Sequence, residues 1–599
     1  MVTPTSLNDP LILQEIARAR KQGKFPSPTD WRKYWIYFIM IDRFNNPDHG
    51  PNFQWNDATR MGFQGGVFEG IRQKLDYLHD LGVGALWLTP ALKNCQYDHT
   101  TYHGYGIQDF LAPEPRFGNH PAQVEDELKA LVHDAHERGI YIIFDIVLHH
   151  TGDVFTYAGL GDLAPWSSQK YVVRWKNSAG VPLWPNPQVS NDPNPRDALV
   201  WPQELQFNTL FEEQGKAGPL AGDFETLRSF AQNNGDLPAL QLLIRAYKDI
   251  IARFDVDGLR IDTLKYISPQ AARIFANAIR EFARTINKEN FFIFGEVWDN
   301  EDEIAQFVGR DTRFTNADTP IGVDAALDFP LFFILPGVCK GSLAPSELVR
   351  VYQKRKEAEE SILSTHGDAS GFFVTFLDNH DQRERFYYQD PTQPHRYDCQ
   401  VTLALGCLFT LPGIPCVYYG TEQGLSGHGD AFEAVREALW GKPHAAEQAD
   451  AFDKQHPFYL ALQQLAQVRK AHPALCYGRY YFRPLSGDGT HFSISSYAPG
   501  VLAYSRILDD QEVLVIANTQ PEQFWVGEVI IDGSLNQPGD SYTLLYSNVG
   551  GPTAPKNVNL HAKGSVTIQE ADGQTITDGP ICVLPVQLQP MEVQIGSKS

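Results

Sequence analysis

Residues 124–150 read VEDELKALVHDAHERGIYIIFDIVLHH, and this stretch decides the fold class. Its first half carries apolar residues at the spacing of one face of an amphipathic helix: Val124, Leu128, Leu131 and Ala135. Gly139 is typical of a helix end, and the apolar run at 141–147 has the length and composition of a strand buried on both faces. A helix that leads into such a strand predicts one repeat of a parallel α/β fold.

The same order of helix and buried strand repeats along the first two-thirds of the chain. The helical patterns, each with the apolar run that follows it, are 68–78 with 85–88, 240–252 with 257–262, and 274–282 with 291–295. The complete set of candidate strands is centred near Tyr37, Leu86, Ile143, Leu259, Phe294, Ala326, Val374 and Pro415. Eight such units predict a closed (β/α)8 barrel, a TIM barrel, rather than an open sheet.

Two further segments interrupt or follow this pattern. The interval from Ile143 to Leu259 is 116 residues (259 minus 143) and contains the Pro- and Asn-rich stretch WPNPQVSNDPNPRD from Trp184, so a loop-rich subdomain is inserted after strand three. After about residue 475 the sequence changes to short β-rich runs between turn residues, typical of an antiparallel β-sandwich. We predict a barrel at 1–150 and 239–475, an inserted subdomain at 151–238 and a C-terminal β-sandwich at 476–599.

Composition limits the partners. The chain has 599 residues, of which 43% are hydrophobic and 20% charged, as in ordinary globular proteins. Its 50 basic and 72 acidic residues give a net charge of −22. Nucleic acids and anionic membranes attract clusters of Lys and Arg, so we expect neither as a partner and favour a neutral substrate. The oligomeric state is not indicated.

Cysteine usage and the N-terminus favour a cytoplasmic protein. The seven cysteines are odd in number, widely spaced and without a C-x-x-C pair, so neither a disulfide framework nor a thiolate metal site is indicated. The first 22 residues, MVTPTSLNDPLILQEIARARKQ, carry charges within their apolar stretch, unlike a signal peptide. No apolar run is long enough to span a membrane. A secreted protein whose signal has been removed is the alternative.

Polar side chains follow four of the predicted strands, at the end of a (β/α)8 barrel where reactive groups are placed. They are Asp145, His149 and His150 after strand three, Arg260 and Asp262 on strand four, Glu296 after strand five, and Asp378, Asn379, His380 and Asp381 after strand seven. One carboxylate at a strand end is usually a helix cap or a solvated charge. Several around one barrel mouth predict a catalytic site.

The spacing of these residues suggests their chemistry. Arg260 and Asp262 are two residues apart on a strand and share a face, so the guanidinium would keep the carboxylate ionised, as a nucleophile requires. Glu296 follows the apolar run 291–294, where desolvation would raise its pKa, as a general acid requires. Asp381 is a third carboxylate, suited to stabilising an oxocarbenium-like transition state.

These four segments resemble the four signature regions of the α-amylase family of retaining glycoside hydrolases, which includes cyclodextrinases and cyclodextrin-forming glucanotransferases. The resemblance runs in order over roughly residues 34–440. It includes MIDRFNN from Met40, LGVGALWLTP from Leu81, YHGYGIQDF from Tyr102 and GIPCVYYGTEQGL from Gly413. The family fold that the resemblance implies is the barrel with an inserted subdomain and a C-terminal β domain.

The resemblance also implies roles for individual residues. The catalytic positions of the family fall on Asp262 as nucleophile, Glu296 as general acid/base and Asp381 as transition-state stabiliser. The positions that hold the nucleophile and the sugar at the cleavage site fall on Tyr105, which would stack under that sugar, and on His150, Arg260 and His380. Asp145 matches an aspartate that supports the site from strand three.

Three hypotheses of function follow. The first is hydrolysis of α-1,4-glucosidic bonds in starch, glycogen or maltooligosaccharides with retention of configuration. The second is transfer of the same glycosyl group to another sugar, as in a 4-α-glucanotransferase or a cyclodextrin-forming enzyme; the segment from Gly420 resembles both classes. The third, a barrel that only binds, is disfavoured because all three carboxylates are present. Signatures of metalloproteases and nucleotide-binding loops are absent, and His149 and His150, as adjacent strand residues, should face opposite ways.

We expect no required cofactor, although the resemblance raises the question of calcium. Many family members hold a calcium ion between barrel and inserted subdomain, with an Asn where this chain has His149 and a His carbonyl where it has Tyr266. A second family site is matched by the loop 45–48, but Val67 stands where an Asp is expected. Calcium prefers oxygen ligands and an imidazole offers none, so we predict that the inter-domain calcium is absent.

Overall fold

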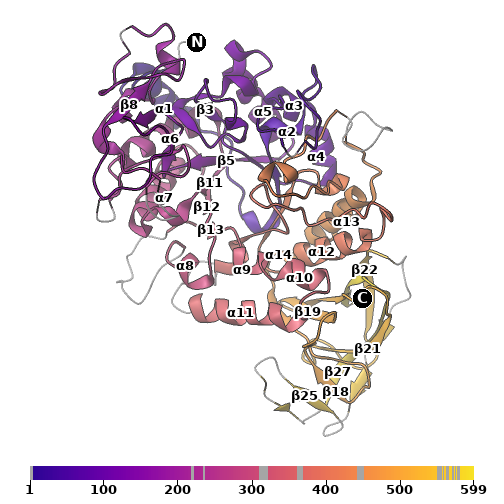
Figure 1. The fold of residues 1–599 in the computed structure, drawn as a ribbon. Helices are drawn as coiled ribbons and strands as arrows, with labels where there is room; N and C mark the ends of the chain where they lie inside the picture. Colours follow the sequence, from indigo (N-terminus) through magenta and orange to yellow (C-terminus); the bar gives the residue numbers. More distant parts are fainter. Residues whose placement is uncertain are drawn as a thin grey trace.

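The computed structural model describes residues 4–57, 59–189, 191–216, 222–233, 236–308, 322–359, 369–441, 451–549, 556–557, 559–561, 566–569, 573, 575–576 and 580–598. A barrel lies at the centre, with the N-terminal helix α1 (Pro10–Gln22) on one side of it and the C-terminal sheets on the opposite side (Figure 1). None of the helices in these described ranges is long and apolar enough to cross a membrane.

Eight parallel strands form the barrel, in the order β13-β12-β11-β5-β2-β1-β15-β14. Their bounds are β1 (Ile36–Ile39), β2 (Ala85–Leu88), β5 (Tyr141–Val147), β11 (Gly258–Asp262), β12 (Phe292–Gly295), β13 (Ala325–Ala326), β14 (Val374–Thr375) and β15 (Ile414–Tyr418). A parallel bridge between Leu327 and Val374 joins the two edges of this sheet and closes the barrel. The predicted TIM barrel is confirmed, and each strand contains the residue at which it was predicted.

The stretch that opened the sequence analysis folds as its pattern predicts. Helix α5 (Val124–Glu137) turns its apolar face into the core, and all seven residues of β5 are buried. Gly139 has a positive φ of 70°, which a glycine adopts without strain, and it ends the helix. The helix predicted at 68–78 is instead two helices, α3 (Phe68–Gln73) and α4 (Leu75–Leu81), because the backbone of Lys74 leaves the helical conformation.

Helices cover the outside of the barrel between strands (Figure 1). Besides α3, α4 and α5 they are α2 (Ile41–Phe44), α6 (Leu240–Phe254), α7 (Pro269–Arg284), α8 (Glu301–Ala305), α9 (Phe329–Phe332), α10 (Leu335–Cys339), α11 (Pro345–Glu359), α12 (Asp398–Thr410), α13 (Pro457–Ala471) and α14 (Pro473–Tyr477). Local sequence sets their ends. In α7, for example, the Ser268 hydroxyl accepts from the Ala271 N–H and Pro269 occupies the first turn.

The segment inserted between β5 and α6 is built from short strands and loops. It contains β6 (His150–Thr151), β7 (Phe155–Tyr157), β8 (Val173–Lys176), β9 (Pro182–Trp184) and β10 (Arg228–Ser229), arranged as a sheet β7-β8-β9 and a pair β6-β10. Buried Arg228 contacts Asp153 at 2.7 Å, Asp223 at 2.9 Å and Asp162 at 3.4 Å. The carboxylates and this buried cation fasten the loops to one another.

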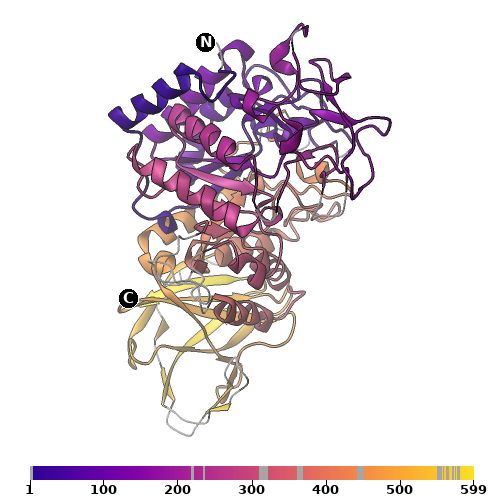
Figure 2. The same cartoon turned by 90° about the vertical axis from the view of Figure 1, so that its left-hand side faces the viewer.

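The C-terminal strands form two sheets below the barrel, shown in yellow in Figure 2. Sheet β16-β19-β20-β28-β22-β23 faces sheet β24-β27-β21-β17-β18-β25-β26. The bounds are β16 (Arg479–Phe482), β17 (Leu485–Ser486), β18 (His491–Ser493), β19 (Val501–Leu508), β20 (Gln511–Asn518), β21 (Trp525–Ile531), β22 (Ser541–Ser547), β23 (Lys556–Asn557), β24 (Asn559–His561), β25 (Thr567–Gln569), β26 (Thr575–Ile576), β27 (Ile581–Leu588) and β28 (Val593–Lys598). The strands pair antiparallel except β18 with β25, and the predicted sandwich is confirmed.

Helix α12 lies between the barrel and these sheets. Its central residues are buried all round, as expected for a helix that is apolar on every face. The Thr410 hydroxyl lies 2.6 Å from the Tyr504 hydroxyl, and Arg506 donates to the Thr410 carbonyl at 2.6 Å. A side chain at Gly406 would come within 2.8 Å of Val593, so the sheet packs directly against the helix. The domain boundaries given above stay predictions.

Candidate active site

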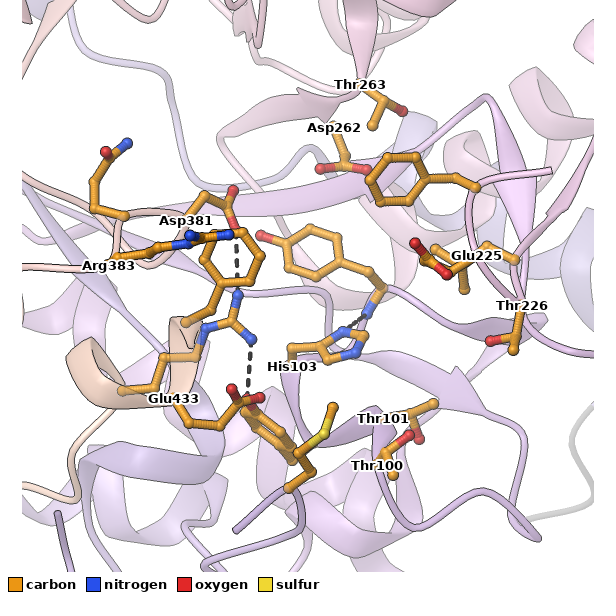
Figure 3. Close-up of a pocket in the computed structure, with 18 of the residues that line it drawn as sticks. Thr100, Thr101, His103, Glu225, Thr226, Asp262, Thr263, Asp381, Arg383 and Glu433 are labelled. Carbon is orange, nitrogen blue, oxygen red and sulfur yellow. Dashed lines mark hydrogen bonds and ion pairs between the residues drawn. The ribbon is translucent and has the colours of Figure 1, made fainter. Parts of the chain in front are cut away.

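A cavity of about 1270 Å³ opens at the carboxyl ends of the barrel strands (Figure 3). Five of the predicted site residues line it: Tyr105, His150, Asp262, Glu296 and Asp381. Asp262 is the last residue of β11, and Glu296 follows β12 directly. Glu225 and Thr226 from the inserted segment face the same cavity (Figure 3). Arg260 and His380 are buried directly behind this lining, so their contact with a substrate stays a prediction.

Arg260 organises the carboxylates. It is 1% exposed and donates to Asp262 Oδ1 at 2.8 Å, to Glu296 Oε2 at 2.8 Å and to both oxygens of Asp145 at 3.0 Å. Two different guanidinium nitrogens hold Asp262 and Glu296, a use of the rigid fork that an ammonium could not reproduce. The N–H of Thr263 donates to the same Glu296 oxygen at 3.0 Å.

Burial and the guanidinium act on these acids in opposite directions. Burial raises the pKa of Asp145 to about 6, and it raises the pKa values of Asp262 and Glu296 above their ordinary range. The positive charge of Arg260 lowers the pKa of each of the three. The N–H of Thr263, which donates to Glu296, also lowers the pKa of that carboxyl group.

Asp381 is held by a different cation. Arg436 donates to Asp381 Oδ1 at 3.2 Å, to the His380 carbonyl at 2.9 Å and to the Tyr102 hydroxyl at 2.9 Å. The Asp381 N–H donates to the Asn379 side chain at 2.9 Å. These contacts fix the loop after β14 and aim the third carboxylate into the cavity.

Tyr105 links Asp145, on β5, to His380, which follows β14. Its hydroxyl donates to Asp145 Oδ2 at 2.9 Å and lies 2.7 Å from His380 Nε2. A tyrosine has one hydroxyl proton, so His380 must carry its proton on Nε2 and donate it to Tyr105. Trp87 donates to Asp145 at 3.1 Å and completes the support of that carboxylate. Asp145 thus contacts the catalytic candidates only through Arg260 and Tyr105.

The imidazoles around the cavity are neutral at ordinary pH. Burial lowers the pKa of His103 to about 3, and it lowers the pKa values of His150 and His380 well below their ordinary value. Nε2 of His150 and Nδ1 of His380 are buried and have no hydrogen-bond partner among the described residues. His150 lines the catalytic cavity, and a neutral imidazole nitrogen without a partner at that position is suited to a substrate hydroxyl.

Sequence reasoning missed several residues of the site. Arg436 holds Asp381 and also donates to the Tyr102 hydroxyl, which in turn donates to Glu433 at 2.9 Å. His103 accepts from the Tyr105 N–H at 3.0 Å and its ring stacks on Tyr105. Tyr102 and His103 belong to the YHGYG motif and Arg436 to the segment from Gly420, so the resemblance offered a signal for each.

One sequence argument about the adjacent histidines is wrong. His149 and His150 were expected to face opposite ways, yet their Nδ1 atoms lie 3.4 Å apart. Strand alternation does not hold there, because β5 ends at Val147 and β6 begins at His150. The two rings lie close together at their Nδ1 atoms, while His150 lines the catalytic cavity and His149 lines a smaller one beside it.

In the N-terminal loop that resembles the second calcium site, two asparagines turn their side-chain nitrogens toward backbone carbonyls. The amide of Asn45 donates to the Gly70 carbonyl at 3.0 Å, and that of Asn46 donates to the Gly65 carbonyl at 2.6 Å. The Asn46 side-chain oxygen accepts the Asp48 N–H at 3.0 Å. The side-chain amides of this loop are thus engaged in hydrogen bonds, and the absence of a calcium ion here stays a prediction.

Comparison with protein families and curated proteins gives one consistent set of relatives. The family model described as the alpha amylase catalytic domain matches residues 38–447. The alpha-amylase of Streptomyces lividans is 27% identical over 502 residues, which cover 75% of this chain and 50% of the relative. The beta/alpha-amylase of Paenibacillus polymyxa is 30% identical over 455 residues, covering 75% of this chain and 31% of the relative. The chain thus spans no more than half the length of these two proteins.

A cyclomaltodextrin glucanotransferase and two solved structures widen the comparison. The transferase, from Geobacillus stearothermophilus, is 25% identical over 550 residues, covering 89% of this chain and 65% of the relative. The alpha-amylase of Geobacillus thermoleovorans, solved with acarbose, has a TM-score of 0.61 at 24% identity, covering 96% of this chain and 99% of its own. A three-domain cyclomaltodextrin glucanotransferase has a TM-score of 0.63 at 22% identity, and the match covers 94% of this chain and 99% of that structure. At these identities the two structures show the shared fold alone.

Proposed function

The chain belongs to the alpha-amylase family, and from that premise we propose that it is a retaining glycoside hydrolase that cleaves α-1,4-glucosidic bonds of starch, glycogen or maltooligosaccharides. One observation carries the proposal: Arg260 holds Asp262 and Glu296 at 2.8 Å each. Both carboxyl groups line a cavity at the barrel mouth together with Asp381. The named residues supply every group that the reaction requires.

In the first step the Asp262 carboxylate attacks the anomeric carbon of the bound sugar. The bond from that carbon to the leaving oxygen breaks, and Glu296 gives its proton to this oxygen. Glu296 Oε2 already accepts from Arg260 and Thr263, so the other oxygen is the one that carries the proton. Asp381, held by Arg436 and close to His380, stabilises the positive charge that develops on the sugar.

In the second step the ionised Glu296 takes a proton from water, and the water oxygen attacks the anomeric carbon. The ester bond to Asp262 breaks and restores its carboxylate. Two displacements at one carbon retain its configuration. The proposal of retention is supported by Arg260, which donates to both Asp262 and Glu296 at 2.8 Å and so keeps the two carboxyl groups close together, whereas an inverting pair stands about 6.5–9.5 Å apart to admit a water.

The substrate class is supported by charge and by the relatives. A net charge of −22 disfavours anionic polymers, and exposed aromatic side chains at the cavity, Phe224, Trp298 and Phe432, offer flat apolar faces to sugar rings. The curated relatives from Streptomyces lividans and Paenibacillus polymyxa both carry the name amylase. The transferase among the relatives supports the alternative, transfer of the glycosyl group to a sugar with the same catalytic residues.

A product profile separates the two activities. Maltoheptaose incubated with the enzyme should give only shorter oligosaccharides, and starch should give reducing ends in proportion to enzyme. Products longer than maltoheptaose, or cyclic products from starch, would replace hydrolysis by transfer. The Asp262→Asn variant serves as the matched control, since it keeps the size of the side chain and removes the nucleophile.

We also propose a cytoplasmic location and no nucleic-acid or membrane partner. All seven cysteines are free and six are buried, which supports a reducing compartment because secreted proteins more often pair their cysteines. Cell fractionation with an antibody to the chain tests the location, and recovery in the extracellular fraction would contradict it.

A further inference from the structure

A second, smaller cavity of about 340 Å³ lies where the inserted subdomain meets the end of β11. His149, Glu212, Gln232 and Tyr266 are among the residues that line it. Tyr266 also lines the catalytic cavity, so the two cavities share a wall. This is the place where the family resemblance puts a calcium ion, and its donor atoms decide whether this chain can hold one.

The residues present do not fit the ion. The carbonyl oxygen of Tyr266 accepts a hydrogen bond of 2.6 Å from Gln232 Nε2. A carbonyl can only accept, so the nitrogen of the Gln232 amide must face it, at the position where a cation would have to sit. His149 offers a ring nitrogen that burial keeps neutral, with its pKa lowered to about 4, where calcium prefers oxygen.

Among the described residues, no cluster of three metal-ligating side chains lies at this cavity. Among the described ranges, one cluster of three His, Cys, Asp or Glu side chains has ligand atoms close enough for a metal ion: His133, Asp134 and Glu137 on α5. It includes neither His149 nor Glu212. Glu212 Oε1 already accepts the Gln232 N–H at 2.8 Å.

We propose that the side chain of Gln232 replaces the metal ion, and that its hydrogen bond to Tyr266 ties the inserted subdomain to the catalytic end of the barrel. The backbone that leads into Gln232 is held by hydrogen bonds, which positions its side chain. Phe230 N–H donates to the His149 carbonyl at 2.9 Å, and Ala231 N–H donates to the Leu210 carbonyl at 2.8 Å. The Gln232 amide therefore starts from a rigid position.

The tie has a consequence for the active site. Tyr266 ends a short turn, and its N–H donates back to the Thr263 carbonyl at 2.9 Å. Thr263 follows Asp262, donates to Glu296 and has a φ of 49°, a left-handed conformation that a β-branched residue adopts only under constraint. Holding Tyr266 is one such constraint. Gln232 is therefore a positioning residue, which acts on Glu296 through Tyr266 and Thr263.

Thermal melting of the full-length chain tests the proposal without reference to activity. The wild-type protein should melt at the same temperature in EDTA and in excess calcium chloride, and dialysed protein should contain no stoichiometric calcium. Gln232→Ala should melt several degrees lower, and calcium should not restore it. Gln232→Glu places a carboxylate oxygen against the Tyr266 carbonyl, so its melting temperature should fall in EDTA and recover with calcium.

Gln206→Ala is the matched control, because Gln206 makes a similar bond of 2.7 Å to the Val200 carbonyl entirely within the inserted subdomain. Gln232→Ala should raise KM for maltoheptaose about fivefold, the worth of one net hydrogen bond, and Gln206→Ala should not. A wild-type melting temperature that falls in EDTA and recovers with calcium would overturn the proposal. So would a Gln232→Ala variant that matches Gln206→Ala in both melting temperature and KM. The melting results stand whether or not the chain hydrolyses glucans.

Discussion

Replacement of Arg260 by methionine removes the cation that contacts Asp145, Asp262 and Glu296 at 2.8 to 3.0 Å. At a charge separation of about 4 Å and an effective dielectric constant of about 20, one such pair is worth about 4 kcal/mol. That energy corresponds to about 3 pH units in the pKa of each carboxyl group. The three contributions do not add, because a buried carboxyl group that loses its partner takes up a proton instead.

The direction of the change follows from the two opposing causes. Burial raises the pKa values of Asp262 and Glu296, and Arg260 lowers them, so the variant leaves burial unopposed. The nucleophile is then protonated at neutral pH. The acid limb of kcat/KM should move to higher pH by about 2 units, and activity at neutral pH should fall about 100-fold.

The loss of stability in Arg260→Met should show the opposite pH dependence to its loss of activity. A carboxyl group whose pKa in the folded protein is raised contributes stability below its unfolded pKa, and that contribution is lost as pH rises through the folded value. Arg260→Met should therefore lower the melting temperature more in alkaline than in acidic buffer.

Initial rates on maltoheptaose across pH, with circular dichroism of the same samples, check both expectations. Arg260→Lys keeps the charge but not the two-nitrogen fork, so its acid limb should move less. Arg350→Met is the control, since Arg350 is exposed and pairs only at the surface with Glu347. A folded Arg260→Met variant with an unchanged acid limb would refute the reasoning.

Three further substitutions test other contacts. Tyr105→Phe removes the hydroxyl that donates to Asp145; it should lower kcat about tenfold and cost about 1–3 kcal/mol in urea unfolding, and an unchanged kcat would contradict this. Arg228→Met leaves buried aspartates of the inserted subdomain without their cation, a loss of about 3–5 kcal/mol; a loss near zero by the same measurement would contradict it. Burial raises the pKa of Glu422, and its Oε2 has no partner among the described residues. Glu422→Gln should therefore raise stability in alkaline buffer by about 1–3 kcal/mol and little in acid, and melts that show the reverse pH dependence would count against it.

The barrel was predictable because its strands are buried on both faces. Such strands appear as unbroken apolar runs, and β5 and β12 show this clearly. The carboxylates of the site were predictable for the same reason, because Asp262 ends one of these apolar strands and Glu296 directly follows another. The break between α3 and α4 at Lys74 was not predictable, since the apolar spacing continues across it. Strand β28 has a weak pattern in the sequence because Gln594 and Gly596 interrupt its apolar residues.

Contacts between distant segments were beyond the sequence. Arg436 reaches Asp381 because a buried ion pair of 2.7 Å between Arg385 and Glu437 joins the loop after β14 to the segment after β15. No periodicity links those segments. Gln232 is similar, since its importance depends on how the inserted subdomain lies against Tyr266.

In the proposed mechanism Asp262 forms a covalent bond to the sugar, while Glu296 first donates a proton and then accepts one. A 5-fluoro maltosyl fluoride, whose intermediate breaks down slowly, tests it most directly by peptide mapping and mass spectrometry of the labelled enzyme. We predict one adduct per chain, on the peptide that contains Asp262, and none in the Asp262→Asn variant. An adduct on another carboxylate, or an active enzyme that forms no adduct and releases the inverted anomer first, would contradict the account.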